Sequence, residues 1–314
     1  MRWIDVEEFV LEQIKQRLEN ASAANPAEVY RQFREAYEPL KDFEKNISYD
    51  LPLTGEAYAL KYHLQRMDNM KVALNRVHNV RPLLASDRNF VLDIGSGTGA
   101  SAMGFMRWLN STCDVQQKQV KVTLCEPSEH MRIVSEQLVP AFKEKLGLGP
   151  NSQFSIYPRN LEECAQKCER EDSPFLDLAI FCYTFWIQRR DEWPSTTKHV
   201  LEIAKAVKPN GTLVFLTPKS NAAKPSYQKV LFMQHLKREL VNAGFNHLEI
   251  DSPSGYHPGQ STCVQRRPDY DAKWPKPVCD LISQMLQSPP LEGNDRPYYS
   301  FSATIDAFSP KDGE

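Results

Sequence analysis

Three alternating glycines directly after a short apolar stretch are the most informative feature of the sequence. Residues 89–93 are predicted to form a strand, and the chain then reaches Gly95, Gly97 and Gly99. Because glycine has no Cβ, the backbone can turn sharply at these positions and approach a ligand closely. A helix is predicted to follow, and the free amides at its N-terminus suit a carboxylate or a phosphate. The order of strand, loop and helix therefore predicts a ligand site.

The spacing of these glycines separates two classes of ligand. The dinucleotide fingerprint is Gly-x-Gly-x-x-Gly, with an acidic residue about 20 residues later that binds the ribose. Here the third glycine, Gly99, comes one position earlier, and Ala100 stands where the fingerprint has glycine. An acidic residue, Asp93, precedes the first glycine by two positions. The loop therefore departs from the nicotinamide-binding pattern, and an oxidoreductase is the weaker alternative.

In these residues the chain resembles the class I S-adenosylmethionine-dependent methyltransferases, whose first motif is an apolar strand ending in Asp or Glu-x-Gly-x-Gly-x-Gly. The resemblance covers residues 89–251 and extends more loosely to residue 307. It implies a Rossmann-like fold with S-adenosyl-L-methionine as the cofactor. The residues of the first motif that it implies as cofactor ligands are Asp93, Gly95, Ser96, Gly97 and Gly99.

Two later strand ends supply further candidates for binding the cofactor. Glu126 ends the second predicted strand and is followed by Pro127. A carboxylate at this position can accept hydrogen bonds from both ribose hydroxyls, and the resemblance implies that role. The same charge also favours the N-terminus of the next helix, which is compatible with ribose binding. After the third strand, the resemblance implies that Asn160 and the backbone of Leu161 hold the adenine.

A turn before the fifth predicted strand adds positional support for the resemblance. Residues 208–211 (Lys-Pro-Asn-Gly) resemble the Leu-Lys-Pro-Gly-Gly turn of the family, with Asn210 in place of the first glycine. Asparagine visits positive φ more readily than most residues, so the replacement is tolerable. A purely structural turn explains the segment equally well. The resemblance also implies that the last strand is antiparallel to its neighbours.

The end of the fourth predicted strand marks the side of the site where methyl transfer is expected. Ligands of open α/β sheets bind outside the carboxyl ends of the strands, which places Cys182 against the cofactor. A lone cysteine at a strand end is more typical of a small buried apolar residue than of a nucleophile. Transfer from an activated sulfonium can rest on positioning, and a base is needed only if the acceptor must lose a proton. The candidate catalytic residues are Tyr183, Asp191 and His257.

The first 85 residues are predicted to be helical. Thr54 is expected to cap a third helix that runs to about Val77. Tyr58, Tyr62 and Arg66 follow one another at intervals of four and are expected to share a face of this helix. This face can cover the methionine end of the cofactor, with Arg66 toward its carboxylate. Packing in the core is the alternative for the tyrosines.

The fold class follows from strands that alternate with helices, a pattern typical of a doubly wound α/β sheet with both faces covered. We expect a mostly parallel, seven-stranded sheet with an N-terminal helical cap and an insertion before the last strand. The expected strands are residues 89–93, 120–126, 153–157, 176–181, 212–217, 247–251 and 298–307. The predicted domains are a helical cap at 1–85 and a cofactor-binding domain at 86–314, with an irregular, proline-rich insertion at 252–297.

Composition limits the partners and the compartment. The formal net charge is -2, so no overall electrostatic attraction to nucleic acid is expected. No apolar run is long enough to span a membrane. Seven scattered cysteines in a chain of this size favour a reduced, cytoplasmic setting. Cys164 and Cys168 are four residues apart on a probable helix, but without a second cysteine or histidine pair they predict no metal site.

The sequence therefore predicts methyl transfer to a small-molecule or peptide-like acceptor. An RNA or ribosomal methyltransferase is the first alternative, because basic residues could form a rim around the site, although dispersed surface charge explains them equally well. These residues are Arg189, Arg190, Lys219, Lys224, Lys237, Arg238, Arg266, Arg267 and Lys276. The second alternative is a methyltransferase-like subunit that binds a partner without catalysis. The acceptor atom and the oligomeric state stay open.

Overall fold

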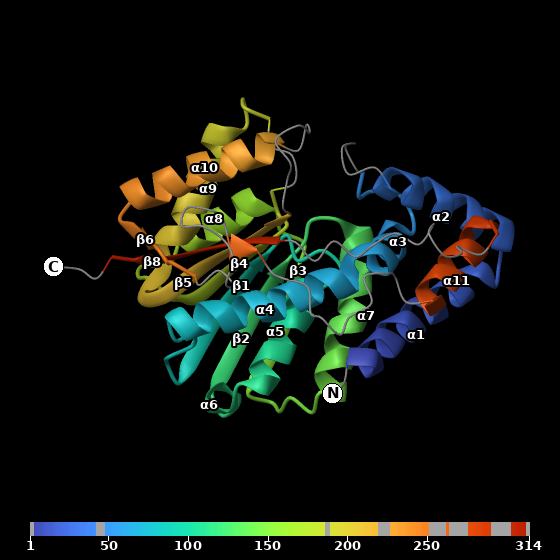
Figure 1. Cartoon of the computed structure of the whole chain (residues 1–314), viewed down its shortest axis with the longest axis horizontal. Helices are drawn as coiled ribbons and strands as arrows, with labels where there is room; N and C mark the ends of the chain where they lie inside the picture. Colours follow the sequence, from blue (N-terminus) through green and yellow to red (C-terminus); the bar gives the residue numbers. More distant parts are fainter. Residues whose placement is uncertain are drawn as a thin grey trace.

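The computed structural model describes residues 3–41, 48–185, 189–218, 227–250, 262–263, 276–289 and 303–311. A central sheet lies between two layers of helices, as Figure 1 shows. In this view α8, α9 and α10 lie above the sheet, α4, α5 and α7 lie below it, and α1, α2 and α11 gather at the right. The predicted α/β architecture is therefore confirmed.

The sheet has the strand order β3-β2-β1-β4-β5-β8-β6. The strands on this path are β1 (Arg88–Ile94), β2 (Gln119–Cys125), β3 (Ser152–Tyr157), β4 (Leu176–Cys182), β5 (Val207–Pro218), β6 (Phe245–His247) and β8 (Ala303–Pro310). The five strands from β3 to β5 pair in parallel, whereas β8 is antiparallel to both β5 and β6. The path has the predicted seven strands, and the short β7 (Thr262–Cys263) pairs with β8 as an eighth strand off this path.

The central strands are buried on both faces, which explains their continuous apolar sequences. Every residue of β4 is buried, and so are the last four residues of β1. Continuous rather than alternating burial is typical of parallel strands covered by helices on both sides. In register, Ile94 at the end of β1 lies between Cys125 of β2 and Phe181 of β4. Three carboxyl ends of strands therefore meet at one edge of the sheet.

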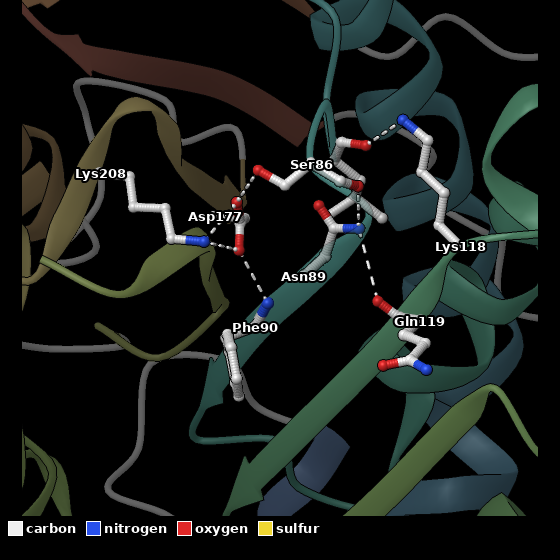
Figure 2. A network of polar contacts seen from close by, with 8 residues as sticks. Ser86, Asn89, Phe90, Lys118, Gln119, Asp177 and Lys208 are labelled. Atoms are coloured by element: carbon white, nitrogen blue, oxygen red, sulfur yellow. Dashed lines mark hydrogen bonds and ion pairs between the residues drawn. The ribbon is translucent and has the colours of Figure 1, made fainter.

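The opposite edge of the sheet is held together by a polar network around Asp177 at the start of β4 (Figure 2). The Asp177 carboxylate accepts hydrogen bonds from the backbone amide of Phe90 at 2.8 Å and from the Ser86 hydroxyl at 3.2 Å. It also forms an ion pair with Nζ of Lys208 at 2.8 Å. Residues 208–211, which resemble a turn in sequence, lie within β5 instead, and Asn210 does not have positive φ. The pairing of β5 with β4 passes from Val207 directly to Thr212, so residues 208–211 form an irregularity within this strand.

The helices of the core follow the strands in the expected alternation. They are α5 (Ala100–Ser111), α6 (Cys113–Gln116), α7 (Glu129–Lys145), α8 (Leu161–Glu169), α9 (Trp193–Lys205) and α10 (Tyr227–Asn242). Ser128 caps α7 by accepting a hydrogen bond from the amide of Met131 at 3.3 Å. Asn160 caps α8 in the same way. Polar caps satisfy amides that the helix itself leaves free, so both helices begin at defined residues next to strand ends.

The N-terminal region is helical, but its third helix differs from the prediction. It consists of α1 (Trp3–Ser22), α2 (Pro26–Lys41), α3 (Thr54–Tyr58), the π-helix η1 (Ala59–His63) and α4 (Leu64–Val80). The N-cap of α3 is Leu53, in the left-handed conformation at φ 61°, and not Thr54, whose hydroxyl is buried without a partner. The prediction that Thr54 caps the helix was therefore wrong, because the preceding turn places Thr54 inside the first helical turn.

Two glycines show how closely the segment from α3 to α4 packs on the core. A Cβ on Gly55 of α3 would lie 2.3 Å from the carbonyl oxygen of His130 in α7. A Cβ on Gly104 of α5 would lie 2.4 Å from the carbonyl oxygen of Met67 in α4. Such close approach of helix backbones needs residues without side chains. The division into a cap at 1–85 and a domain at 86–314 stays a prediction.

The segment 252–297 is not irregular throughout, as the sequence analysis had expected. It contains β7 and the helix α11 (Lys276–Leu286), which lies beside α1 and α2 (Figure 1). Four buried residues spaced i, i+3, i+4 and i+7 form its apolar face: Val278, Leu281, Ile282 and Met285. The proline-rich flanks concealed this helical pattern, which the packing against α1 and α2 supports.

Candidate functional site

A cavity of about 230 Å³ opens at the edge of the sheet where the strands β1, β2 and β4 end. Its walls come from the glycine loop after β1, the ends of β2 and β4, the start of α8 and the N-terminal helical region. The lining residues are Tyr49, Tyr58, Arg66, Ile94, Gly95, Gly97, Glu126, Pro127, Met131, Arg159, Asn160, Leu161, Cys182, Tyr183 and Thr184. Several segments far apart in the sequence therefore meet in one site.

The glycine loop has a backbone conformation that only glycine adopts readily. Gly95, Gly97 and Gly99 have φ of 65°, 57° and 84°, in the left-handed region. A Cβ at Gly95 would lie 3.0 Å from Thr184, and one at Gly99 would lie 2.5 Å from Val139. At Gly97 the nearest atom would be 3.4 Å away, so the backbone conformation alone requires glycine there. The loop can therefore approach a ligand without side chains in between.

Glu126 connects the glycine loop to the end of β2. Its carboxylate accepts hydrogen bonds from the amide of Gly97 at 2.8 Å and from the amide of Ser128 at 2.9 Å. Burial raises the pKa of the Glu126 carboxyl, while these two hydrogen bonds lower it. Each carboxylate oxygen accepts only one of these bonds and keeps further capacity. Glu126 is thus held in place and can still accept hydrogen bonds from a ligand.

The start of α8 forms the far wall of the cavity. Asn160 and Glu163 form a capping box, in which the Asn160 side-chain oxygen accepts from the Glu163 amide at 2.9 Å. The predicted adenine-binding Asn160 therefore already uses its acceptor, and its side-chain NH₂ group is what it can offer a ligand. Leu161 is the first residue of the helix, so its amide has no partner within the helix. This amide is available to a heterocyclic base.

Arg66 is a buried cation that aromatic rings surround. Its guanidinium carbon lies 4.1 Å from the ring centre of Tyr183, 4.9 Å from that of Tyr58 and 5.0 Å from that of Tyr62. It is 8% exposed, and its Nε has no hydrogen-bond partner. Within the described part of the chain no carboxylate forms an ion pair with it. A buried charge without a counter-ion is unfavourable, so Arg66 is suited to an anionic ligand group.

Tyr183 has an unusual backbone conformation at the end of β4. Its φ is 60°, a value that costs a bulky residue about 1–3 kcal/mol. The side-chain NH₂ group of Asn69 in α4 donates a hydrogen bond to its hydroxyl at 2.6 Å. Burial raises the pKa of this phenol above its ordinary value, so it stays protonated at neutral pH. Tyr183 lines the cavity as predicted, and its catalytic role stays a prediction.

Cys182, the last residue of β4, also lines the cavity. Burial raises the pKa of its thiol above the usual range. A thiol rather than a thiolate is a poor nucleophile. This environment agrees with the interpretation of Cys182 as a small apolar residue next to the ligand.

Four predicted site residues that the structure describes do not line this cavity. Asp93 is fully buried behind the loop, where the Ser101 hydroxyl donates to it at 2.5 Å, and burial raises its pKa to about 7. Ser96 and Gly99 are also not among the lining residues. Asp191 is exposed and forms an ion pair with Arg189 at 2.7 Å. His257 lies outside the described residues.

Four lining residues were missed by the sequence analysis: Tyr49, Ile94, Met131 and Arg159. A fifth, Thr184, lies at the end of the fourth strand, where the methyl-transfer site was expected. Thr184 donates a hydrogen bond to the carbonyl oxygen of Ile94 at 2.7 Å and so joins the ends of β4 and β1. The backbone of Tyr49 accepts from the Ser128 hydroxyl at 2.7 Å. Met131 lies in the first turn of α7 and faces Gly97. These contacts join segments that are distant in sequence, and no local motif indicates them.

A buried histidine supports the glycine loop from the N-terminal region. His63, the last residue of η1, contacts the Thr98 hydroxyl at 2.9 Å and the Met103 sulfur at 3.0 Å. Burial lowers its pKa to about 3, so its imidazole is neutral. The π-helix thus fixes the loop to the helices that carry Tyr58 and Arg66. Single-turn π-helices occur often at functional sites.

The described residues contain no group of three or more histidine, cysteine, aspartate or glutamate residues suited to a metal ion. Cys164 and Cys168 are buried on α8, where they pack in the hydrophobic core. No helix of the described structure is long and apolar enough to cross a membrane.

Solved structures with a similar arrangement were found, although no protein-family model and no curated protein matches the chain. A SAM-dependent methyltransferase from Archaeoglobus fulgidus is 12% identical, with a TM-score of 0.41, and the match covers 78% of this chain and 94% of that one. A TehB-like SAM-dependent methyltransferase from Corynebacterium glutamicum is 10% identical, with a TM-score of 0.36 and coverage of 77% and 88%. The plantazolicin methyltransferase BpumL, in complex with SAH, is 8% identical, with a TM-score of 0.39 and coverage of 96% and 99%.

The observed strand order can be compared directly with the fold that the sequence led us to expect. The chain has five parallel strands in the order β3-β2-β1-β4-β5, and the last strand of the chain, β8, is inserted antiparallel between β5 and β6. The glycine loop lies at the carboxyl end of the central strand β1, as the resemblance implied. The fold expected from the resemblance to the class I S-adenosylmethionine-dependent methyltransferases is therefore confirmed.

Proposed function

We propose that this protein is a methyltransferase that uses S-adenosyl-L-methionine and acts on a small-molecule or peptide-like acceptor. One observation carries the proposal. A single cavity joins a glycine loop, a carboxylate at a strand end, a helix N-terminus and a buried arginine that pairs with no carboxylate among the described residues. These four features have the chemistry needed for the sugar, the base and the amino acid part of the cofactor.

The nucleoside half of the cofactor fits the side of the cavity formed by β2 and α8. Glu126 keeps acceptor capacity for the ribose hydroxyls, and its own position is fixed by the amides of Gly97 and Ser128. The amide of Leu161 and the side-chain NH₂ of Asn160 can donate to ring nitrogens of adenine. Met131 offers an apolar surface beside the loop.

The methionine half fits the side formed by the glycine loop and α4. Arg66 supplies the positive charge for the carboxylate, and Gly97 leaves space that a side chain would fill. A guanidinium can form two parallel hydrogen bonds with a carboxylate, which gives both affinity and orientation. Asp93, Ser96 and Gly99 support the loop from behind in this proposal.

The bound cofactor supplies a methyl group that its sulfonium has already activated. The residues of the chain then contribute by binding and orienting the reactants, which accounts for a large part of catalysis in such displacements. Cys182, Tyr183 and Thr184 line the cavity at the end of β4, where we place the acceptor. Tyr183 is proposed as a hydrogen-bond donor, because its phenol stays protonated. Asp191 and His257 remain proposed bases by sequence position alone.

Tyr49 and Tyr58 of the N-terminal region line the cavity and support the choice of acceptor. A partly covered, mostly apolar cavity suits a small molecule or a single side chain better than an extended polymer. We therefore propose that the N-terminal helices act as a cap. We also propose a cytoplasmic location, which the free thiols of the described cysteines support.

Titration calorimetry with S-adenosylhomocysteine, NAD and NADP tests the cofactor assignment directly. We expect S-adenosylhomocysteine to bind at one site and the two nicotinamide nucleotides to show no binding. Binding of NAD or NADP without binding of S-adenosylhomocysteine contradicts the proposal. A screen of acceptors with methyl-labelled cofactor then separates a small molecule from RNA, whose binding would fall steeply with salt.

A further inference from the structure

Arg66 can serve a carboxylate only if its guanidinium is held in one orientation. Its planar group lies against the ring of Tyr183, with the guanidinium carbon 4.1 Å from the ring centre, the shortest of its three aromatic contacts. Its Nε is buried and has no partner. The orientation of the guanidinium therefore depends mainly on the ring on which it stacks.

The ring of Tyr183 is in turn held by one hydrogen bond from another helix. The Asn69 side chain donates to the Tyr183 hydroxyl at 2.6 Å, across 114 residues of sequence. Asn69 is completely buried on α4, and its side-chain oxygen has no partner. Among the described residues, the side-chain amide of Asn69 bonds only to a tyrosine at the cavity, which indicates a role in placing that tyrosine.

The backbone conformation of Tyr183 also restricts where its ring can lie. Tyr183 lies at the end of β4 with φ of 60°, a conformation that a tyrosine rarely adopts unless the surrounding structure requires it. Its amide is bonded to the carbonyl oxygen of Leu216 in β5 at 2.8 Å. With the backbone fixed by the sheet and the hydroxyl fixed by Asn69, the ring has both ends held.

We infer that Asn69 is a positioning residue, which holds the Tyr183 ring so that Arg66 presents its N–H groups to the carboxylate of the cofactor. This inference rests on the proposed function. It assigns a binding contribution to a residue that does not line the cavity. Removal of the Asn69–Tyr183 hydrogen bond is expected to weaken recognition of the carboxylate and to leave recognition of the nucleoside unchanged.

Two ligands that differ only in the carboxylate test the inference by calorimetry: S-adenosylhomocysteine and its decarboxylated analogue. The variants are Asn69→Leu, which keeps the branching of the side chain without its polar atoms, Tyr183→Phe, which keeps the ring, and the double variant. Each single variant is expected to bind S-adenosylhomocysteine about five- to tenfold more weakly, the value of one hydrogen bond. The double variant is expected to lose no more than either single one. Affinity for the decarboxylated analogue is expected to change less than about twofold.

A buried asparagine elsewhere serves as the matched control. Asn89 is 1% exposed and donates to the carbonyl oxygens of Ser86 and Gln119, away from the cavity. Asn89→Leu is expected to lower the free energy of unfolding and to keep the affinity of the folded protein for both ligands. Where Asn69→Leu folds poorly, Tyr183→Phe alone carries the test.

The outcomes separate the inference from the proposed function. If the wild-type protein binds neither ligand, the proposed function is wrong. If it binds both but Asn69→Leu weakens them equally, or if the losses of the two single variants add, the positioning role is overturned while the cofactor assignment stands.

Discussion

The two edges of the sheet differ in the partners that their buried charged side chains have. At the edge where strands begin, Asp177 accepts from the Phe90 amide and the Ser86 hydroxyl and pairs with Lys208. At the edge where strands end, Arg66 is buried among aromatic rings and its Nε has no partner. Asp177 thus has counter-charge and hydrogen bonds from the chain itself, whereas Arg66 has none from a described carboxylate. The first edge stabilises the fold, and the second keeps polar capacity for a ligand.

The largest expected effect concerns the stabilising edge. Asp177→Ala leaves Lys208 without its counter-ion and the Phe90 amide without an acceptor. We expect the free energy of unfolding to fall by about 3 kcal/mol, the usual result of breaking a largely buried ion pair. Urea unfolding measures this change. The affinity of the folded protein for S-adenosylhomocysteine should stay within about twofold, and a larger loss would show that the two edges are not separate.

A substitution of Arg66, at the ligand edge, is expected to have the reverse effect: it should weaken ligand binding without lowering stability. Arg66→Met removes a buried charge that has no counter-ion in the described part of the chain, so we expect the free energy of unfolding to stay the same or to rise by up to about 1 kcal/mol. Loss of a charged hydrogen-bonding partner should weaken binding of S-adenosylhomocysteine by about ten- to a hundredfold. Urea unfolding and calorimetry on the same preparation measure both. A marked loss of stability with unchanged binding would place Arg66 on the structural side of the comparison.

Two glycines with similar backbone conformations sharpen the comparison within the loops. Gly97 and Gly147 have φ of 57° and 66°, and neither would suffer a severe clash from an added Cβ. Substitution of either by alanine should cost about 1 kcal/mol of stability, because alanine is strained at positive φ. Only Gly97→Ala should also weaken binding of S-adenosylhomocysteine in calorimetry. Equal binding by the two variants would show that Gly97 serves only the turn.

The smallest expected effect is on the pH dependence of stability. Two buried groups near the glycine loop, Asp93 and His63, change stability with pH in opposite directions. Asp93 has a pKa of about 7 in the folded protein against 3.8 ordinarily, so the folded state holds more protons between these values. This group therefore lowers stability as pH rises from about 4 to 7. His63 has a pKa of about 3 against 6.5, so the unfolded state holds more protons, and this group raises stability as pH rises.

Asp93→Asn removes the contribution of Asp93 and leaves that of His63. We expect its free energy of unfolding to increase more steeply between pH 4 and 6.5 than that of the wild type, by at most about 1.4 kcal/mol per pH unit. Urea unfolding at several pH values measures the difference between the two proteins. Parallel pH profiles would show that Asp93 does not hold a proton in the folded protein.

Local sequence predicted the parts of the fold and the site that depend on consecutive residues. The glycine loop, Glu126 after β2 and the start of α8 at Leu161 are all features of a strand end followed by a helix start. Such features are set by backbone conformation, glycine and helix caps, which are properties of short segments. The apolar runs of β1 and β4 predicted buried parallel strands for the same reason.

The remaining parts depend on packing between distant segments. Helix α11 escaped prediction because its apolar face is short and lies between proline-rich flanks. Thr54 looked like a cap, but the turn at Leu53 decides where α3 begins. Asp93 stays a predicted ligand residue, but sequence did not indicate that its carboxylate is buried and accepts a hydrogen bond from Ser101. A sequence pattern does not specify which side of a loop a residue faces.

By itself, the sequence determined that a strand, a glycine loop and a helix follow one another, with an acidic residue at the next strand end. It did so because each of these features needs only neighbouring residues. The surroundings of Arg66 were decided only by the tertiary structure. Tyr183 from β4 and Asn69 from α4 meet there across 114 residues, with Tyr183 at positive φ. Only the packing of α4 against the edge of the sheet brings these groups within hydrogen-bonding distance.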